Sequence, residues 1–465
     1  MTNSDIRNRA QRHLYPHFTT GQVWNDPNLP IIVRGEGSYL FDEDGNKFLD
    51  GLAGLFCANI GHGRKDIPAA AYEQMSKLAF WTNWGSAHPA AVDAATAIAE
   101  QAPGDLDVVF FVNSGSEAVE SAIKFARQYH RGEGEPERTK IIARHMAYHG
   151  TTLGALAVTG IPAYKEAFGP LMPGVFHVPN TLGEVIPEGG SAADLPSIQA
   201  IREVIAREGA HTIAALFAEP VQNSRGALVP PPGYWQELRS ICDEHGILLV
   251  ADEVITGFGR LGEWFGSIKY GVVPDMITFA KGATSGYAPL GGVIIRKPLA
   301  DGMLASPQAG VFTHGATWGG HPVSTAVAVA NLKALKEENV VGNVRSLEPY
   351  FQNGLDSIVS AHSSIKEYRG AGFFYSIELM GNRETGRELT ADESKALLGQ
   401  VMPQAMREVN LITRPDNRGA TMLVLSPPLV ADQDVLDDLL HKVDHVMGAV
   451  DSFLKAPAAL ASASA

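Results

Sequence analysis

Short apolar runs alternate with stretches of helical periodicity between residues 61 and 320, and this alternation constrains the fold more than any other feature. Stretches such as 117–129 and 234–245 separate the runs. Runs of this length, bounded by turn residues, are typical of strands buried on both faces. They lie at 108–112, 141–143, 212–219, 247–252, 276–280 and 291–296. The alternation predicts an α/β fold with a mostly parallel sheet covered by helices on both faces.

The two ends of the chain have a different pattern. The segment GSYLFDEDGNKFLDG (37–51) predicts a hairpin, because two apolar-aromatic runs flank the turn DEDGN. Helical periodicity resumes near Val323 and continues with short strands near 375–379 and 422–426. The Gly-, Ser- and Pro-rich stretch 180–197 predicts a surface insertion, and residues 456–465 are expected to be disordered.

Composition excludes several classes of protein. The formal net charge of -14 argues against a nucleic-acid-binding protein, which usually carries a basic patch. Cys57 and Cys242 are the two cysteines, so no disulfide framework exists and a reducing cytosol is favoured. The polar amino terminus lacks the features of a signal peptide, and no apolar run approaches the roughly 18–20 residues that span a bilayer. We expect a soluble cytoplasmic protein without a membrane partner and, for lack of metal-ligand spacing, without a metal.

Two adjacent carboxylates, Asp252 and Glu253, end the apolar run that begins at Ile247. In open α/β sheets, ligands bind at the carboxyl ends of the strands. A buried carboxylate there must be paired, hydrated, hydrogen-bonded or coordinated, because an isolated buried charge is very costly. We expect Asp252 to face a ligand and Glu253 to be a structural hydrogen-bond acceptor.

Two further features lie at the ends of other predicted strands. In VNSGSEAVESAIKFARQY a strand leads into a helix near Ser116, whose free amides suit a phosphate, and Gly115 permits close approach. Alternatively, Ser114 only caps the helix and Glu117 completes a capping box. Lys281 follows the apolar run MITFA, where burial would favour the neutral amine needed for Schiff-base chemistry. The alternative is a lysine that turns outward to solvent.

The three features together match one cofactor, pyridoxal 5'-phosphate. This cofactor has a phosphate, a ring nitrogen that must stay protonated, and an aldehyde that forms an imine with a lysine. Asp252 would pair with the ring nitrogen, and Lys281 would hold the aldehyde carbon.

The chain also resembles the class III (fold-type I) pyridoxal-phosphate aminotransferases, most closely the pyruvate-dependent ω-transaminases. The blocks that carry the resemblance are LLVADEVITGFGRLGEWFG, PDMITFAKGATSGYAPLGG, NSGSEAVESAIKFAR, YHGTTLGALAVTG, EPVQ and HGATWGGHP. The likeness extends from about residue 30 to 450. It implies a large domain at 61–322 with a mostly parallel, seven-stranded sheet, and a smaller α+β domain built from 1–60 and 323–455.

The resemblance also implies roles for single residues. Lys281 and Asp252 take the catalytic roles given above, and Lys281 also moves a proton. Thr317 reaches the phosphate from the other subunit, which implies a homodimer that can pair further into a tetramer. His149, His314 and His321 are expected to be structural. The remaining cofactor contacts are the phosphate turn (Gly115, Ser116), the residues on the two ring faces (Tyr148, Val254) and a supporting carboxylate (Glu219).

Substrate choice is inferred from positions further from the cofactor. Arg414 resembles the mobile arginine that pairs with the carboxylate of pyruvate; the alternatives are a solvated arginine, or Arg418 in the same role. Val424 stands where relatives that act on ornithine, acetylornithine or γ-aminobutyrate carry a fixed arginine. Arg225 is either solvated or favours an anionic substrate tail.

Aromatic side chains are expected around the substrate. Phe56 and Trp84 occupy pocket positions, with Phe18 as a weaker candidate, and ordinary core packing is the alternative for each. Ala316 replaces an aromatic ring that close relatives often carry, which would widen the pocket.

The implied reaction is a ping-pong transfer of an amino group from an ω-amino acid, diamine or primary amine to pyruvate, giving alanine. Three alternatives stay open. A 2-oxoglutarate-dependent enzyme would need a second carboxylate site near Arg225 or Arg418. A class III aminomutase, racemase or decarboxylating relative would show no net transfer to pyruvate. A non-catalytic cofactor-binding protein would not respond to amines.

Overall fold

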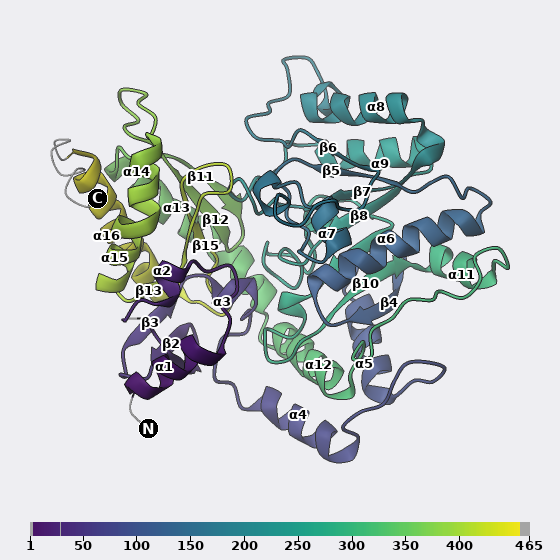
Figure 1. Cartoon of the computed structure of the whole chain (residues 1–465), viewed down its shortest axis with the longest axis horizontal. Helices are drawn as coiled ribbons and strands as arrows, with labels where there is room; N and C mark the ends of the chain where they lie inside the picture. The colour runs from purple at the N-terminus through teal and green to yellow at the C-terminus, as the bar shows by residue number, and fades with distance from the viewer. Residues whose placement is uncertain (1–2, 28, 456–465) are drawn as a thin grey trace.

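A computed structural model describes residues 3–27 and 29–455 and contains a seven-stranded sheet with two smaller sheets beside it (Figure 1). Five neighbouring strands of the large sheet run parallel, while β10 is antiparallel to β9 and β4. The predicted mostly parallel sheet is therefore confirmed. In spatial order the strands are β4 (Leu106–Val112), β10 (Gly291–Arg296), β9 (Met276–Phe279), β8 (Leu248–Asp252), β7 (Ile213–Ala218), β5 (Lys140–Arg144) and β6 (Val175–Val178).

Helices cover both faces of this sheet because successive strand residues point to opposite faces and both sets are apolar. Phe217 and Val250 pack under one layer, and their neighbours Leu216 and Leu249 pack under the other. The first layer consists of α6 (Gly115–Gly132), α7 (Leu153–Val158) and α11 (Lys297–Ala305). The second consists of α5 (Pro89–Ala99), α8 (Pro196–Glu208), α9 (Tyr234–His245) and α12 (Pro322–Glu337).

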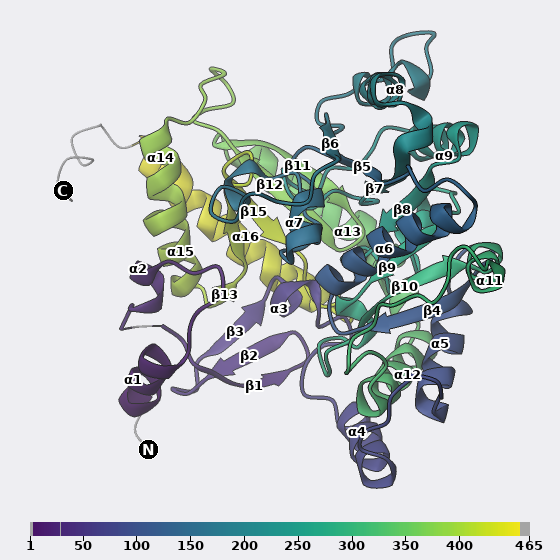
Figure 2. The same ribbon diagram turned by 45° about the vertical axis from the view of Figure 1, so that its right-hand side comes forward.

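The two smaller sheets lie beside the large one and contain residues from both ends of the chain (Figure 2). The predicted hairpin is present, and β13 pairs with its second strand in parallel, Leu411 opposite Leu49. One sheet has the order β1 (Ile32–Glu36), β2 (Tyr39–Asp42), β3 (Lys47–Asp50) and β13 (Leu411–Ile412). The other has the order β11 (Ile365–Ala371), β12 (Phe374–Leu379), β15 (Met422–Leu425) and β14 (Arg414–Asp416).

The remaining α-helices lie outside the two layers of the large sheet. They are α1 (Asn3–His13), α2 (Gly21–Trp24), α3 (Ala53–Phe56), α4 (Asp66–Lys77), α10 (Gly266–Lys269), α13 (Val340–Ala361), α14 (Ala391–Ala396), α15 (Met402–Glu408) and α16 (Gln433–Lys455). Across residues 3–27 and 29–455, no helix combines the length and the apolar character that a membrane span needs.

Most predicted elements are found within one or two residues of their expected bounds. The stretch 180–197 is a largely exposed connection that contains one short 3-10 turn, as expected of an insertion. Strands β1, β6, β11, β13 and β14 were not predicted, because they are very short or mix polar and apolar residues. The proposed domain boundaries stay a prediction, and the expected disordered tail, 456–465, lies outside the described residues.

Candidate active site

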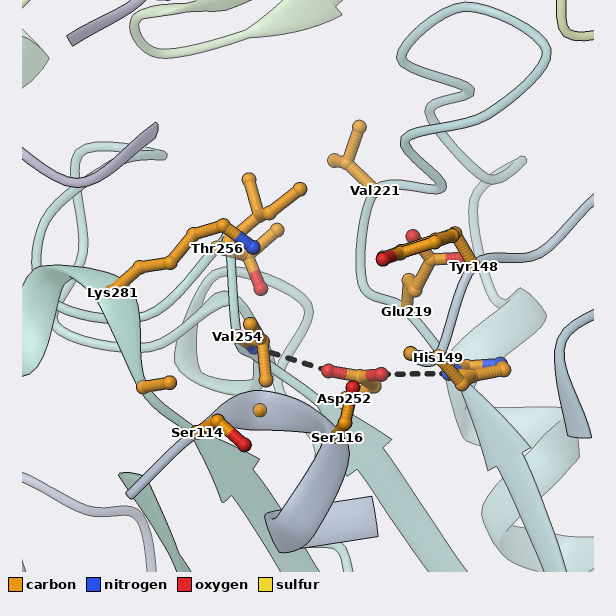
Figure 3. A pocket seen from close by; sticks show the side chains of 14 residues that line it. Ser114, Ser116, Tyr148, His149, Glu219, Val221, Asp252, Val254, Thr256 and Lys281 are labelled. Carbon is orange, nitrogen blue, oxygen red and sulfur yellow. Dashed lines mark hydrogen bonds and ion pairs between the residues drawn. The ribbon is translucent and has the colours of Figure 1, made fainter. Parts of the chain in front are cut away.

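A cavity opens where β9, β8, β7 and β5 end and α6 begins (Figure 3). It therefore lies at the edge of the sheet where the sequence places its candidate residues. Seven predicted residues line it: Gly115, Ser116, Tyr148, Glu219, Asp252, Val254 and Lys281. Seven others complete the wall: Ser114, His149, Gly150, Val221, Ile255, Thr256 and Ala280.

Lys281 follows β9 by two residues, and its side chain extends into the cavity from one side (Figure 3). The alternative of an outward-turned lysine is therefore wrong. Burial is the largest influence on its amine and lowers its pKa. Cys57 and Asp252 oppose the shift, while the charge of Arg414 adds to it. The net effect makes the neutral, nucleophilic amine easier to reach than in water.

Asp252 is the last residue of β8, and both of its carboxylate oxygens have partners in the protein. His149 Nδ1 lies 2.6 Å from one oxygen, and the Val254 backbone N–H donates to the other at 3.1 Å (Figure 3). His149 was expected to be only structural, but it lines the cavity and its Nε2 has no partner in the described part of the chain. In the sequence, the one hint that His149 belongs to the site was that it directly follows Tyr148, a predicted cofactor contact.

The start of α6 forms the floor of the cavity and supports both interpretations of its sequence. Ser114 caps the helix by accepting the Glu117 backbone N–H at 3.3 Å. The predicted capping box is wrong in its second half, because the Glu117 carboxylate accepts the N–H of Asn113 at 2.7 Å instead. The first N–H groups of a helix have no partner within it. A Cβ on Gly115 would lie 2.9 Å from the Val254 side chain, so any larger residue in this turn would force Val254 to shift.

Tyr148 and Glu219 lie across the cavity from Lys281 (Figure 3). The Tyr148 ring meets Tyr164 edge-on, with centroids 6.3 Å apart. One oxygen of Glu219 accepts the Asn223 N–H at 2.9 Å, while the other is buried and has no partner in the described residues. Burial raises the pKa of Glu219. A buried acceptor without a donor suits a ligand that brings a hydroxyl or an N–H group.

Glu253 does not face the cavity. Its hydrogen bonds confirm the expected structural role. It is fully buried, and its carboxylate accepts the Thr256 hydroxyl at 2.7 Å and the N–H groups of Gly266 and Ser267 at 2.6 and 2.7 Å. The Ser267 hydroxyl also donates to it. The carboxylate thereby ties the end of β8 to the start of α10.

Replacement of Glu253 by alanine is expected to lower the free energy of unfolding by about 3 kcal/mol, because four buried donors lose their acceptor. Urea unfolding followed by circular dichroism measures this. Glu263→Ala is the matched control: Glu263 pairs with Arg345 at 2.7 Å near the surface, and its loss should cost under about 1 kcal/mol. Equal losses in the two variants would contradict the assigned role.

Arg414 and Phe56 lie next to the cavity without lining it. The Arg414 guanidinium lies 5.3 Å from the centroid of the Phe56 ring, and its Nη2 donates to Asn223 Oδ1 at 3.3 Å. Burial, reinforced by the charge of Arg418, lowers the pKa of Arg414 to about 10. Phe56 shares an apolar cluster with Val221, a cavity residue. Arg414 is therefore not a solvated surface arginine.

The other two candidate arginines are bound to carboxylates. Arg418 Nε donates to Asp416 at 2.9 Å, and Arg225 Nη1 donates to Glu378 at 3.1 Å. Arg225 is therefore not a solvated arginine, and its preference for an anionic substrate tail stays a prediction.

Two of the three candidate histidines serve the fold, as expected. The Nε2 atom of His314 lies 2.8 Å from the hydroxyl of Ser121 on α6. His321 accepts the backbone N–H of Val323 at 3.2 Å and so caps α12.

Thr317, Trp84 and Phe18 are exposed and do not line the cavity within one chain. Trp84 lies beside Gly315, next to Ala316. The Phe18 ring lies 5.6 Å from that of Tyr164. Their predicted roles stay predictions.

One group of carboxylates in the described residues is close enough together to share a metal ion: Asp42, Glu43 and Asp44. They lie at the hairpin turn, where Asp42 accepts the N–H groups of Asp44 and Asn46 at 3.0 and 2.8 Å. These bonds already account for the Asp42 carboxylate as part of the turn, and the absence of a metal stays a prediction.

Comparisons with known proteins agree with this geometry. A model of the family "Aminotransferase class-III" matches residues 20–447. A probable aminotransferase of Mycobacterium tuberculosis is 42% identical over 452 residues, 94% of each chain. A putrescine–pyruvate aminotransferase of Pseudomonas aeruginosa is 38% identical over 94% of this chain and 96% of its own. The crystal structure of an (S)-enantioselective ω-transaminase from Thermomicrobium roseum superposes with a TM-score of 0.90 at 38% identity, covering 97% of this chain and 99% of that one.

Proposed function

Because this chain belongs to the class III aminotransferases, we propose that it transfers the amino group of a primary amine, diamine or ω-amino acid to pyruvate. The single observation that carries the proposal is that Lys281 and Asp252, at the ends of adjacent strands β9 and β8, face one cavity. The similar protein from Pseudomonas aeruginosa is named for the same acceptor.

The residues of the cavity fit pyridoxal phosphate. When bound, the cofactor supplies an electron-poor ring that stabilises negative charge on the substrate carbon. Lys281 would hold its aldehyde carbon, Asp252 its ring nitrogen, and the start of α6 its phosphate. Tyr148 and Val254 would lie on its two faces. The oxygen of Glu219 that has no partner in the described residues could accept a hydrogen bond from a donor group of the cofactor.

Lys281 and Asp252 have separate roles in the reaction. Lys281 Nζ, whose pKa is lowered by burial, would take a proton from the substrate carbon and deliver it to the aldehyde carbon of the cofactor. Asp252 keeps a negative charge in place, oriented by His149 and the Val254 N–H.

Pyruvate is favoured over 2-oxoglutarate by how firmly the three arginines considered for a substrate carboxylate are held. Arg414 has one contact with Asp416 at 3.1 Å and one with Asn223 at 3.3 Å, and it can take one substrate carboxylate in exchange. The two arginines considered for a second carboxylate, Arg225 and Arg418, are engaged with Glu378 and Asp416. Val424, at the position of a fixed arginine in other relatives, is buried in the apolar cluster of Phe56.

A homodimer is part of the proposal. Thr317 lies in an exposed segment, and large aromatic side chains that include Trp81, Trp84 and Trp318 are more than half exposed in one chain. Clustered exposed aromatic residues are typical of subunit interfaces. A second chain would cover them and bring its Thr317 to the phosphate.

An absorbance spectrum of the purified protein tests the function. Loaded with pyridoxal phosphate, the protein should show a band near the edge of the visible range that bleaches with putrescine or a monoamine. Pyruvate should restore the band and yield alanine. A band that responds to amines but returns only with 2-oxoglutarate would contradict the choice of acceptor, and the lack of any band would contradict the cofactor.

Replacement of Arg414 by methionine is expected to raise the KM for pyruvate about twentyfold, because the carboxylate loses its guanidinium partner. Propanal, an aldehyde that also has three carbons but no carboxylate, serves as the control acceptor. Its kcat/KM should change by less than about threefold. A parallel loss with both acceptors would show that Arg414 only supports the fold.

A further inference from the structure

Asp416 connects Arg414 with Arg418. It is two residues after Arg414 on β14, so both side chains lie on the same face of the strand. Its side chain is only 4% exposed, and Oδ2 lies 3.1 Å from Arg414 Nη2. The same carboxylate binds Arg418. One buried anion is therefore shared between two guanidinium groups.

The two arginines are held very unequally. Arg418 Nε donates to both oxygens of Asp416 at 2.9 Å, its Nη2 lies closer still, and its backbone N–H donates at 2.9 Å. Its carbonyl accepts the N–H of Arg225 at 3.0 Å, which fixes the main chain. Arg414 has one contact with Asp416 and one with Asn223, lies 5.3 Å from the centroid of the Phe56 ring, and has a buried Nε without a partner in the described residues. Arg414 is therefore the member that can leave.

The charges of the cluster do not balance. Two guanidinium groups and one carboxylate leave one excess positive charge in a buried place. Burial on its own would raise the pKa of Asp416, but the bonds and charges of the arginines hold it below its ordinary value. Asp416 thus stays ionised and attracts Arg414, while Arg418 repels it.

Asn223 links this cluster to the cavity. Its backbone N–H donates to Glu219 at 2.9 Å, and its side-chain oxygen accepts from Arg414 at 3.3 Å. Arg414 therefore rests within one residue of the cavity wall, where a substrate carboxylate and Asp416 can compete for it.

We propose that Asp416 determines substrate specificity by acting as the internal counter-ion of Arg414. With an uncharged amine in the site, Asp416 keeps the guanidinium paired inside the protein. A substrate carboxylate must displace Asp416, so the strength of this contact sets the preference between carboxylate and uncharged substrates. The inference rests on the proposed function, which supplies the two kinds of substrate.

Replacement of Asp416 by asparagine in the holoenzyme tests the proposed counter-ion role. The ratio of kcat/KM for pyruvate to kcat/KM for propanal should rise about fivefold, because Arg414 loses its competing anion. The KM for an uncharged monoamine donor should rise by a similar factor, because Arg414 no longer has an internal partner. Propanoate, a carboxylate that cannot react, should bind about fivefold more tightly by calorimetry.

Glu378→Gln is the matched control. Glu378 is also a buried carboxylate held by arginines, Arg225 and Arg369, on the same small sheet, but it does not contact Arg414. It should leave the pyruvate-to-propanal ratio and the affinity for propanoate unchanged. If Asp416→Asn does not fold, the double variant Asp416→Asn/Arg418→Gln removes the pair together. This variant should still bind propanoate about twofold more tightly than the wild type.

Unchanged ratios and unchanged propanoate affinity in a folded variant would overturn the proposal, as would equal changes in Glu378→Gln. These outcomes are separate from a failure of the proposed function. A wild-type enzyme that does not convert pyruvate to alanine would refute that function, while the propanoate measurements would still decide the role of Asp416.

Discussion

Replacement of Lys281 by alanine is expected to lower kcat for amine-to-pyruvate transfer about 100,000-fold. The variant would lose the one amine that lines the cavity among residues 3–27 and 29–455, and with it both the covalent and the proton-transfer roles. Residues that act together in one catalytic unit show losses of this size. Alanine formation over hours, with a large excess of enzyme, gives the residual rate.

Lys269 offers the control for this variant. It lies on α10, where its amine bonds to the carbonyl of Leu261 at 3.1 Å and pairs with Glu348 at 3.3 Å, away from the cavity wall. Lys269→Ala should keep activity within about twofold. A Lys281→Ala enzyme that retains even a hundredth of the wild-type rate would show that another group moves the proton.

Replacement of Asp252 by asparagine is expected to lower kcat/KM about 1,000-fold, with little change in the fold. Asparagine has nearly the same shape and can still accept the Val254 N–H, but it has no charge to hold a proton on a ring nitrogen. The variant should also show an altered absorbance spectrum of the bound cofactor, because the ring would be unprotonated.

Asp275 offers the control for Asp252→Asn. Its substitution also removes a buried carboxylate, but at a position away from the cavity. It precedes β9, at the opposite edge of the sheet, and accepts the Leu249 N–H and an Arg239 donor, each at 2.7 Å. Asp275→Asn should lower the stability of the fold but leave kcat/KM within about threefold. Similar kinetic losses in both variants would remove Asp252 from its assigned role.

The site residues at the strand ends could be predicted because each one directly follows the apolar run that forms its strand. An apolar run that ends in Asp252 or precedes Lys281 fixes both the strand and the edge at which the side chain emerges. The glycine of the α6 turn could be predicted for the same reason. Contacts between distant segments could not: the His149–Asp252 bond joins residues 103 apart.

The arginines show where an interpretation based on residue type fails. Arg225 looked available because its partner, Glu378, is 153 residues away on β12. Arg418 was different, since its partner Asp416 is only two residues away and offered a local signal that was not used. Whether a buried arginine is free depends on how many carboxylates surround it, and only the folded chain gives that number.

The parallel pair β3–β13 has a consequence for how the protein is made. The sheet that contains Leu49 is complete only after Leu411 has been synthesised. At 5–20 residues per second, translation of the chain between them takes roughly 20–70 s. During that time the amino-terminal hairpin is an unfinished sheet with an open edge, at risk of pairing with other nascent chains. Yield in cells should therefore depend on translation speed and chaperone supply more than on the stability of the finished enzyme.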